Sequence, residues 1–121
     1  MDIDGIIPLH TAPTNVDHYE IAAEKRVSGD PRQSVANGYS DPCGEFHVGI
    51  WQGEPAIWHV AYSEYEYCEI LEGRIRMTDD SGASMEVGPG DRFVIAAGFR
   101  GTWEVLERAR KVYVIFEKNP R

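Results

Sequence analysis

From residue 45 onward, apolar and polar side chains alternate in short stretches that are separated by turn residues. In residues 65–71, for example, Glu66, Cys68 and Ile70 fall on one face and the residues between them fall on the other. Trp103 and Val105 likewise share a face. A period of two is that of a β-strand with one buried side. Residues 111–117 are apolar on both faces, which is typical of a strand covered on both sides.

This alternation predicts about eight strands and no helix after residue 44. Sequences such as DDSG at 79–82 and GPGD at 88–91 are typical of turns, because Asp and Gly favour turn conformations. Short strands at this spacing favour an all-β fold, an antiparallel sandwich or barrel. The predicted strands are residues 46–52, 56–62, 65–71, 74–78, 84–87, 91–96, 102–107 and 111–117.

The first 44 residues show little periodicity, and four prolines interrupt them. We therefore expect an irregular N-terminal arm. The segment DHYE at 17–20 fits either a short helix capped by Asp17 or an extended segment at the edge of a sheet. An arm of this length is too long to be a loop without a structural role. We expect it to order along the barrel of a second subunit, which would give a homodimer.

Charge and hydropathy exclude two classes of partner. The 121 residues include 12 Lys and Arg against 20 Asp and Glu, for a formal net charge of −8, which repels the phosphates of nucleic acid. The longest apolar run is too short to span a membrane, and the acidic N-terminal residues are not typical of a signal peptide. We expect a cytoplasmic protein without membrane or nucleic-acid partners, in which Cys43 and Cys68 are reduced thiols.

Several motifs then resemble a known family: ILEGR at 70–74, GPGDRFVI at 88–95, GFRGTWEVLE at 98–107 and RKVYVI at 110–115. They resemble the cupins, and within them the single-domain branch of the (S)-ureidoglycine aminohydrolase-type cupins, many of which have no assigned activity. The ethanolamine-utilisation cupin is a related type. The resemblance implies a cupin-type jelly-roll β-barrel at residues 45–121, preceded by the N-terminal arm at residues 1–44.

The cupin motifs also imply positions for metal ligands. Glu66 occupies the glutamate position. The first cupin motif has two histidines before this glutamate, and under the longer of its two spacings they fall on His59 and Ala61. The histidine of the second motif falls on Gly101. A transition metal needs three or four protein ligands. We therefore expect no metal cofactor; if a divalent metal does bind, Glu66 and His59 are its ligands.

Glu66 is the main candidate for a catalytic or ligand-binding role. A carboxylate that points into an apolar barrel needs a hydrogen-bond donor, and Tyr62, an arginine or Lys111 could supply it. The alternative is a structural hydrogen bond to a barrel tyrosine. We expect Glu66→Gln to weaken ligand binding at little cost in stability.

Cys68, on the same face, is the second catalytic candidate. A cysteine nucleophile needs a nearby base that stabilises the thiolate, and His59 or His47 could be that base if the fold brings it close. The alternative is that Cys68 is a small buried apolar residue.

Four residues are candidates for substrate contacts: Tyr62, His59, Trp103 and Lys111. Because the position of Gly101 points inward, Trp103 should point inward as well. There it would fill the space of the missing metal ligands or form an aromatic wall for a ligand. Lys111 is expected, with several arginines, at the surface or rim of the barrel, where one of these cations could face a substrate carboxylate.

Three functions remain open at this point. The first is a barrel that binds a small polar metabolite, with or without catalysis; the resemblance implies a nitrogen-bearing ligand such as a ureide or an amine. The second is a metal-dependent enzyme of the ureidoglycine aminohydrolase type with an unusual ligand set. The third is a non-catalytic dimeric accessory or sensor protein.

Overall fold

The structure is a computed structural model that describes residues 3–9 and 15–120. The described residues form nine strands and one short 3-10 turn, η1 (Ala23–Lys25), so the prediction of an all-β fold is confirmed. No helix in this part of the chain is long and apolar enough to cross a membrane. The strands are β1 (Asp17–Glu20), β2 (Arg26–Gly29), β3 (Arg32–Ser40), β4 (Phe46–Gly53), β5 (Ala56–Ala61), β6 (Tyr65–Asp79), β7 (Ser84–Val87), β8 (Arg92–Ile95) and β9 (Arg100–Phe116).

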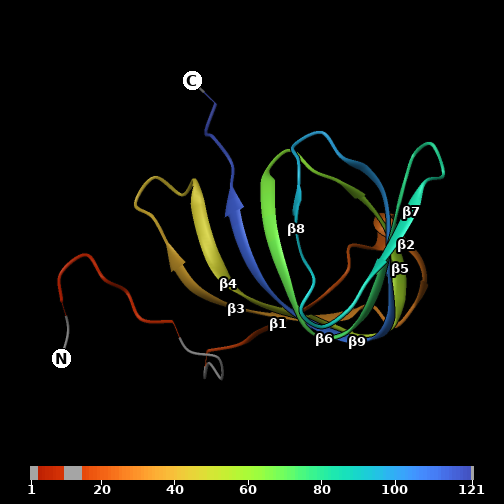
Figure 1. Cartoon of the computed structure of the whole chain (residues 1–121), viewed down its shortest axis with the longest axis horizontal. Helices are drawn as coiled ribbons and strands as arrows, with labels where there is room; N and C mark the ends of the chain where they lie inside the picture. Colours follow the sequence, from red (N-terminus) through yellow and green to blue (C-terminus); the bar gives the residue numbers. More distant parts are fainter. Residues whose placement is uncertain (1–2, 10–14, 121) are drawn as a thin grey trace.

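All strand pairings are antiparallel, and they form one sheet that curls into two facing layers (Figure 1). The first layer has the order β1–β3–β4–β9–β6–β8. The second has the order β2–β5–β9–β6–β7. The two longest strands, β6 and β9, pass through both layers and connect them. The result is a curled half-barrel.

β6 and β9 can belong to both layers because the sheet bends across them. The sequence predicted a separate strand on either side of Gly73, but the structure has one continuous strand there. The register of its pairing with β9 shifts between Ile70 and Ile75. Such a shift is a β-bulge, and it bends the strand. Gly73 has a φ of +86°, and a Cβ at this position would collide with the carbonyl oxygen of Arg108. Glycine is therefore required at the bend.

The structure corrects the prediction of an irregular N-terminal arm. β1, β2 and β3 all lie within it, and β3 pairs with β4 of the predicted barrel. Asp17–Glu20 takes the extended alternative, as the edge strand of the first layer. The pattern of β3, RQSVANGYS, hid the strand because small and polar residues interrupt its apolar face. Long-range pairing with β4, which a local pattern does not contain, stabilises it.

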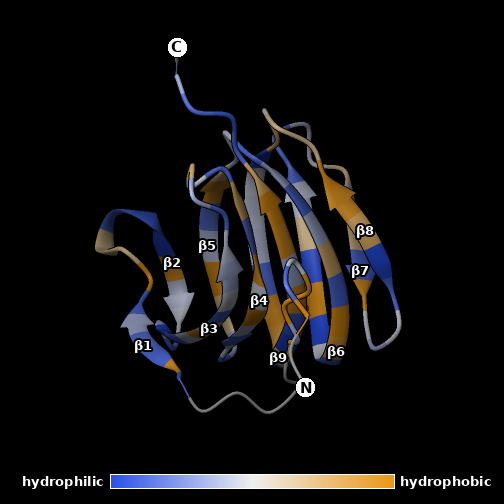
Figure 2. Ribbon diagram, turned by 90° about the vertical axis from the view of Figure 1, so that its left-hand side faces the viewer, coloured by the Kyte–Doolittle hydropathy of each residue, from blue (hydrophilic) through white to orange (hydrophobic). Residues whose placement is uncertain are grey.

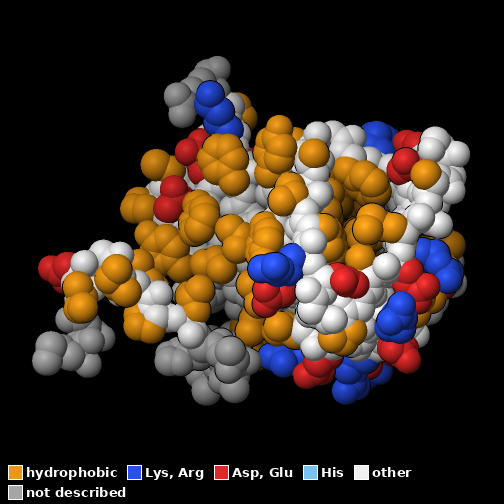
Figure 3. Space-filling model, viewed as in Figure 1, with side chains coloured by type: hydrophobic (Ala, Val, Ile, Leu, Met, Phe, Trp, Pro, Cys, Tyr) orange, Lys and Arg blue, Asp and Glu red, His pale blue; other side chains and the backbone are white. Residues whose placement is uncertain are grey.

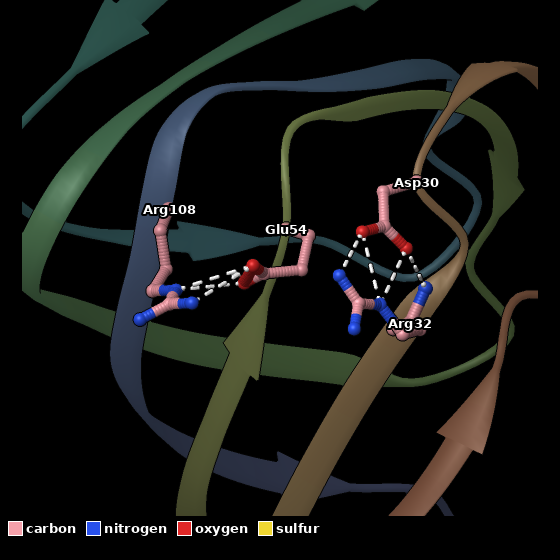
Figure 4. A network of polar contacts seen from close by, with 4 residues as sticks. All are labelled: Asp30, Arg32, Glu54 and Arg108. Atoms are coloured by element: carbon pink, nitrogen blue, oxygen red, sulfur yellow. Dashed lines mark hydrogen bonds and ion pairs between the residues drawn. The ribbon is translucent and has the colours of Figure 1, made fainter.

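Ion pairs lie where β3, the β4–β5 turn and the bend of β9 meet (Figure 4). Arg108 on β9 donates to Glu54 in the turn, with Nε and Oε2 2.8 Å apart. Beside this pair, Arg32 at the start of β3 donates to Asp30, with Nε and Oδ2 3.0 Å apart. The hydrogen bond from Arg108 lowers the pKa of Glu54, against the opposing effect of burial. The side chains of Arg32 and Arg108 are 71% and 64% exposed, and water screens such pairs, so we assign them a minor structural role.

Side chains of both layers fill the space between them, and the predicted alternation of β6 and β9 is confirmed. Cys68, Ile70, Trp103 and Val105 are all buried on the inner faces. Figure 2 shows the same alternation as changes of hydropathy along β4, β6 and β9. One inner position of β9 is not apolar: Lys111 is buried as well. That lysine marks the candidate site.

Candidate functional site

The space between the layers contains a cavity of about 460 Å³. It lies between β3, β4 and β9 of the first layer and β5 of the second, and all three tryptophans of the chain line it. The aromatic and polar residues in its lining are Tyr19, Lys25, Gln33, Asn37, His47, Trp51, Trp58, His59, Tyr62, Glu64, Glu66, Trp103, Lys111 and Tyr113.

Glu66 and Lys111 form a buried ion pair in the wall of this cavity. Lys111 Nζ donates to Glu66 Oε2 at 2.6 Å, and the two side chains are only 7% and 8% exposed, respectively. They stand on the paired strands β6 and β9, where alternation directs both inward. Burial lowers the pKa of Lys111, but Cys68 and the Glu66 carboxylate raise it, and the net direction is upward. The lysine is therefore a cation at neutral pH, and the pair can hold or transfer a proton.

Aromatic rings complete the surroundings of this cation. Lys111 Nζ lies 4.1 Å from the ring centroid of Trp103 and 5.1 Å from that of Trp51. Trp58 contacts both tryptophans, with ring centroids 6.1 and 6.2 Å away. The negative face of an indole attracts a cation, and the attraction increases when water is excluded. The protein thus supplies its own buried cation between indole rings and a carboxylate.

Cys68 joins the pair as a hydrogen-bond donor. Its Sγ lies 3.0 Å from Glu66 Oε2 and 3.6 Å from Lys111 Nζ, and the residue is 0% exposed. Burial raises the pKa of the Cys68 thiol to about 12, although Lys111 opposes the rise. Nucleophilic catalysis requires the thiolate. The geometry therefore favours a buried structural thiol over a nucleophile.

The cavity lining contains hydrogen-bonding groups that lack a partner. In the described part of the chain, Trp103 Nε1 and Gln33 Nε2 are the buried side-chain atoms without one. Gln33 accepts a hydrogen bond from Trp51 Nε1 through its Oε1 at 3.2 Å, which fixes its amide orientation. Both hydrogen bonds to Glu66 use Oε2, and no described residue donates to its Oε1. An unpartnered buried donor costs about 1–3 kcal/mol, so a ligand that accepts hydrogen bonds here would be favoured.

The other predicted contact residues lie in the same region. Tyr62 lines the cavity, its ring contacts Phe99 at 6.2 Å, and burial together with Glu66 raises its pKa. Trp103 points inward and is 1% exposed, as predicted. His59 lines the cavity but is exposed, because it alternates with the buried Trp58. Whether these residues contact a substrate remains a prediction.

The expected surface or rim position of Lys111 is wrong. Lys111 is directly opposite Trp51 in the β4–β9 pairing, on the inner face. Its neighbours in the sequence, Arg110 and Val112, belong to the outer face. A lysine that follows an arginine, just before the apolar residues 112–116, gave no local sign that it is buried.

The metal ligands of the cupin motifs do not fit this cavity. Ala61 has no donor atom, and a Cβ at Gly101 would collide with the carbonyl oxygen of Thr78, so no histidine can stand there. Within residues 3–9 and 15–120, no group of three His, Cys, Asp or Glu side chains could hold a metal ion. The carboxylate that remains, Glu66, is bound by an ammonium group. The absence of a metal cofactor stays a prediction, and this pairing is its physical basis.

Sequence reasoning missed several residues of the cavity, chiefly Trp51, Trp58 and Gln33. The sequence contained one usable signal for Trp51, which has Gly49 and Gly53 two positions away on the same strand face. A Cβ at Gly49 would crowd the Tyr113 hydroxyl, and a Cβ at Gly53 would collide with the Trp51 ring. Glycines two positions before and two positions after a tryptophan, on the same face of a strand, thus indicate that the fold leaves room for a large ring.

Comparison with known proteins agrees with this architecture. The family model for the EutQ-like cupin domain matches residues 40–113. The chain belongs to this family. No curated protein matches it.

Solved structures of EutQ-like and DUF861 cupins are similar. A DUF861 family protein from Thermotoga maritima has 36% sequence identity and a TM-score of 0.54, with 55% of this chain and 76% of that chain covered. A DUF861 protein of unknown function from Pseudomonas syringae has 21% identity and a TM-score of 0.76, with 84% of this chain covered. This chain spans only 44% of that protein. The Clostridium difficile EutQ protein has 16% identity and a TM-score of 0.64, with 84% and 76% covered.

Proposed function

We propose that this EutQ-like cupin binds a small polar, nitrogen-bearing metabolite in the cavity between its layers. The observation that carries the proposal is the Lys111–Glu66 ion pair in the cavity wall, in which both described donors use Oε2 of the carboxylate and no described residue donates to Oε1. An amine or amide N–H of a ligand can donate to that oxygen. A hydrogen bond to a charged group contributes about 1.5–3 kcal/mol, which is enough to select such ligands from among apolar ones.

The unpartnered donors limit the chemical class of the ligand further. Trp103 Nε1 and Gln33 Nε2 need an acceptor, and both residues line the cavity. A planar amide or ureide carries N–H donors and a carbonyl acceptor together, and a flat group packs well against indole rings. The resemblance to ureidoglycine aminohydrolase-type cupins points to the same chemical class. Substrate identity and any catalytic step at Glu66 belong to this proposal.

Intrinsic fluorescence offers a direct test, because all three tryptophans of the chain line the cavity. The protein is titrated with small ureides, amides, primary amines and, for comparison, carboxylates without nitrogen. We expect saturable changes in emission with the nitrogen-bearing compounds and none with the carboxylates. A response to carboxylates alone, or to no compound at millimolar concentration, would contradict the proposal.

A matched pair of substitutions makes the test specific. Gln33→Glu keeps the acceptor that Trp51 Nε1 uses but removes the unpartnered N–H groups. Gln52→Glu makes the same chemical change on β4, away from the cavity lining. We expect affinity to fall about tenfold in the first variant, as for one lost hydrogen bond of about 1.4 kcal/mol. Equal affinities in the two variants would place the ligand elsewhere.

A further inference from the structure

The inner face of β3, β4 and β9 is polar at one end of the cavity, where Asn37, His47 and Tyr113 line it. The outer face at this end is apolar, and it carries the exposed register partners Phe46 and Phe116. Figure 3 shows apolar side chains gathered over the part of the molecule where these strands lie, while charged ones gather at the lower right. A sheet that covers a core normally has the opposite arrangement. Polar groups on an inner face therefore indicate a role in the cavity.

A chain of hydrogen bonds joins these polar side chains to the loop before β4. Tyr113 Oη lies 2.8 Å from Asn37 Oδ1, and Asn37 Nδ2 lies 2.8 Å from Ser40 Oγ. Ser40 Oγ lies 2.6 Å from His47 Nδ1. His47 Nε2 lies 3.1 Å from the backbone carbonyl oxygen of Gly44. The chain thus begins at a backbone carbonyl and ends at a hydroxyl in the cavity wall.

The carbonyl determines the direction of every hydrogen bond in this chain. A carbonyl oxygen only accepts, so neutral His47 carries its proton on Nε2, and its Nδ1 accepts from the Ser40 hydroxyl. Because that hydroxyl donates its one proton to the imidazole, it accepts from Asn37 Nδ2. Asn37 then presents Oδ1 to Tyr113, which donates to it. The single hydroxyl proton of Tyr113 is therefore directed away from a ligand.

Toward the cavity, Tyr113 Oη can act only as a hydrogen-bond acceptor. Tyr113 is 5% exposed and lines the cavity, and no described residue donates to its oxygen. Burial raises the pKa of Tyr113 to about 12, so the group stays a hydroxyl at neutral pH. Gly49 gives this hydroxyl room, because a Cβ there would lie 2.5 Å from it.

Tyr113 is a near neighbour of the other acceptor in the cavity wall, Glu66 Oε1. Tyr113 pairs with Cys68 in the register of β9 and β6, and Glu66 is two residues from Cys68 on the same strand face. Such diagonal neighbours lie about 7–8 Å apart. The carboxylate also contributes to the raised pKa of Tyr113. One wall of the cavity thus presents two acceptors side by side.

We propose that Tyr113 determines ligand specificity, and that its hydroxyl oxygen and Glu66 Oε1 together bind a terminal amino group of the ligand. The proposal rests on the proposed function and limits it to ligands with at least two N–H bonds on one nitrogen. Asn37, Ser40 and His47 are positioning residues, which act by holding the Tyr113 proton away from the ligand. A ligand with a methyl group or an oxygen at this place would leave both acceptors without a donor.

Calorimetric titration of the full chain with benzamide and acetophenone tests the proposal, because these probes differ only by NH2 in place of CH3. We expect wild type to prefer benzamide about 100-fold, for two hydrogen bonds of about tenfold each. Tyr113→Phe should weaken benzamide binding about tenfold and leave acetophenone binding no weaker. Tyr39→Phe makes the same change on β3 outside the cavity lining and should alter neither affinity.

Asn37→Ala separates positioning from a merely structural role. The substitution removes the acceptor of the Tyr113 proton, so the hydroxyl becomes free to donate to the carbonyl oxygen of acetophenone. We expect the preference for benzamide to fall about tenfold, in part because acetophenone binds more tightly than in wild type. A structural defect would weaken the binding of both probes. Asn37→Ala is also the second variant should circular dichroism show that Tyr113→Phe is not folded.

Nitrogen-15 NMR of the histidine side chains at pH 8 tests the chain without any ligand. We expect His47 as the Nε2–H tautomer; the Nδ1–H tautomer would reverse the direction of the chain and overturn the proposal. Equal affinities of wild type for the two probes, or wild-type benzamide affinity in Tyr113→Phe, would also overturn it while the proposed function stands. If neither probe binds at millimolar concentration, the proposed function and this inference fail together.

Discussion

Lys111 Nζ and Glu66 Oε2 lie 2.6 Å apart on neighbouring strands, although 45 residues separate them in the sequence. The lysine thus binds the carboxylate that cupin metal sites use as a ligand. Because the two charges are nearly equal in burial and opposite in sign, each is tolerated in the interior only while the other is present. This dependence determines how the protein should respond to substitution, to pH and to chelators.

Removing one member of the pair should destabilise the fold strongly. Glu66→Gln leaves the Lys111 ammonium buried without its carboxylate, and such a change costs about 3–5 kcal/mol. The sequence alone suggested a small cost, because the amide preserves the shape of the side chain. Urea unfolding followed by tryptophan fluorescence measures the difference.

The double variant Glu66→Gln/Lys111→Met is the control for this prediction. It removes both charges, and a neutral pair of similar volume is commonly about as stable as the ion pair it replaces. We expect it to regain most of the stability that Glu66→Gln loses. Additive losses in the double variant would show that the two residues do not act as a pair.

The ion pair should also make stability depend on alkaline pH. The pKa of Lys111 is raised in the folded protein above its ordinary value of 10.5. The stabilisation is therefore fully present below pH 10.5 and is lost as the pH rises through the folded pKa. Urea midpoints of wild type and Lys111→Met should differ by a constant amount at pH 7–9 and converge only as the pH rises above 10.5 through the folded pKa. Comparison with Lys111→Met removes the common contribution of the buried tyrosines. Convergence already at pH 9 would mean that the lysine is not held as a cation.

Only one of the two cysteines should react with a thiol reagent in the native protein. Cys43 is exposed, whereas Cys68 is buried and its pKa is raised to about 12. At pH 8, a thiol with that pKa is thiolate in only about one molecule in ten thousand. We expect one thiol per chain to react rapidly in the native protein and two to react rapidly in urea. In native Cys43→Ser, no thiol should react rapidly. Rapid modification of Cys68 would restore the nucleophile hypothesis.

Local patterns located the strands after residue 45, because alternation and turn residues directly encode a half-buried strand, but they divided β6 and β9 into two strands each. They failed where the structure depends on distant pairing. β3 has a weak pattern of its own but is held between β1 and β4. The continuity of β6 through Gly73 likewise depends on β9, which stays paired on both sides of the bulge. Neither relation is visible in a window of neighbouring residues.

The same limit applies to the candidate site. Alternation placed Glu66, Cys68 and Trp103 on inner faces, and the structure places them there. Lys111 was named as one possible donor to Glu66 but was expected near the surface, because its sequence neighbours, Arg110 and Val112, give no sign of its partner. Its inward position follows from the register of β9 with β4 and β6. Register is a property of the whole sheet.

Calorimetric titration of chelator-treated protein, with the strongest ligand found by fluorescence, tests the central claim most directly. The claim is that the cavity binds its ligand through protein groups around Glu66 and Lys111, without a metal. We predict one site per chain, an affinity that chelation leaves unchanged, about tenfold weaker binding in Gln33→Glu and unchanged binding in Gln52→Glu. Binding that chelation abolishes and a divalent transition metal restores would contradict the account.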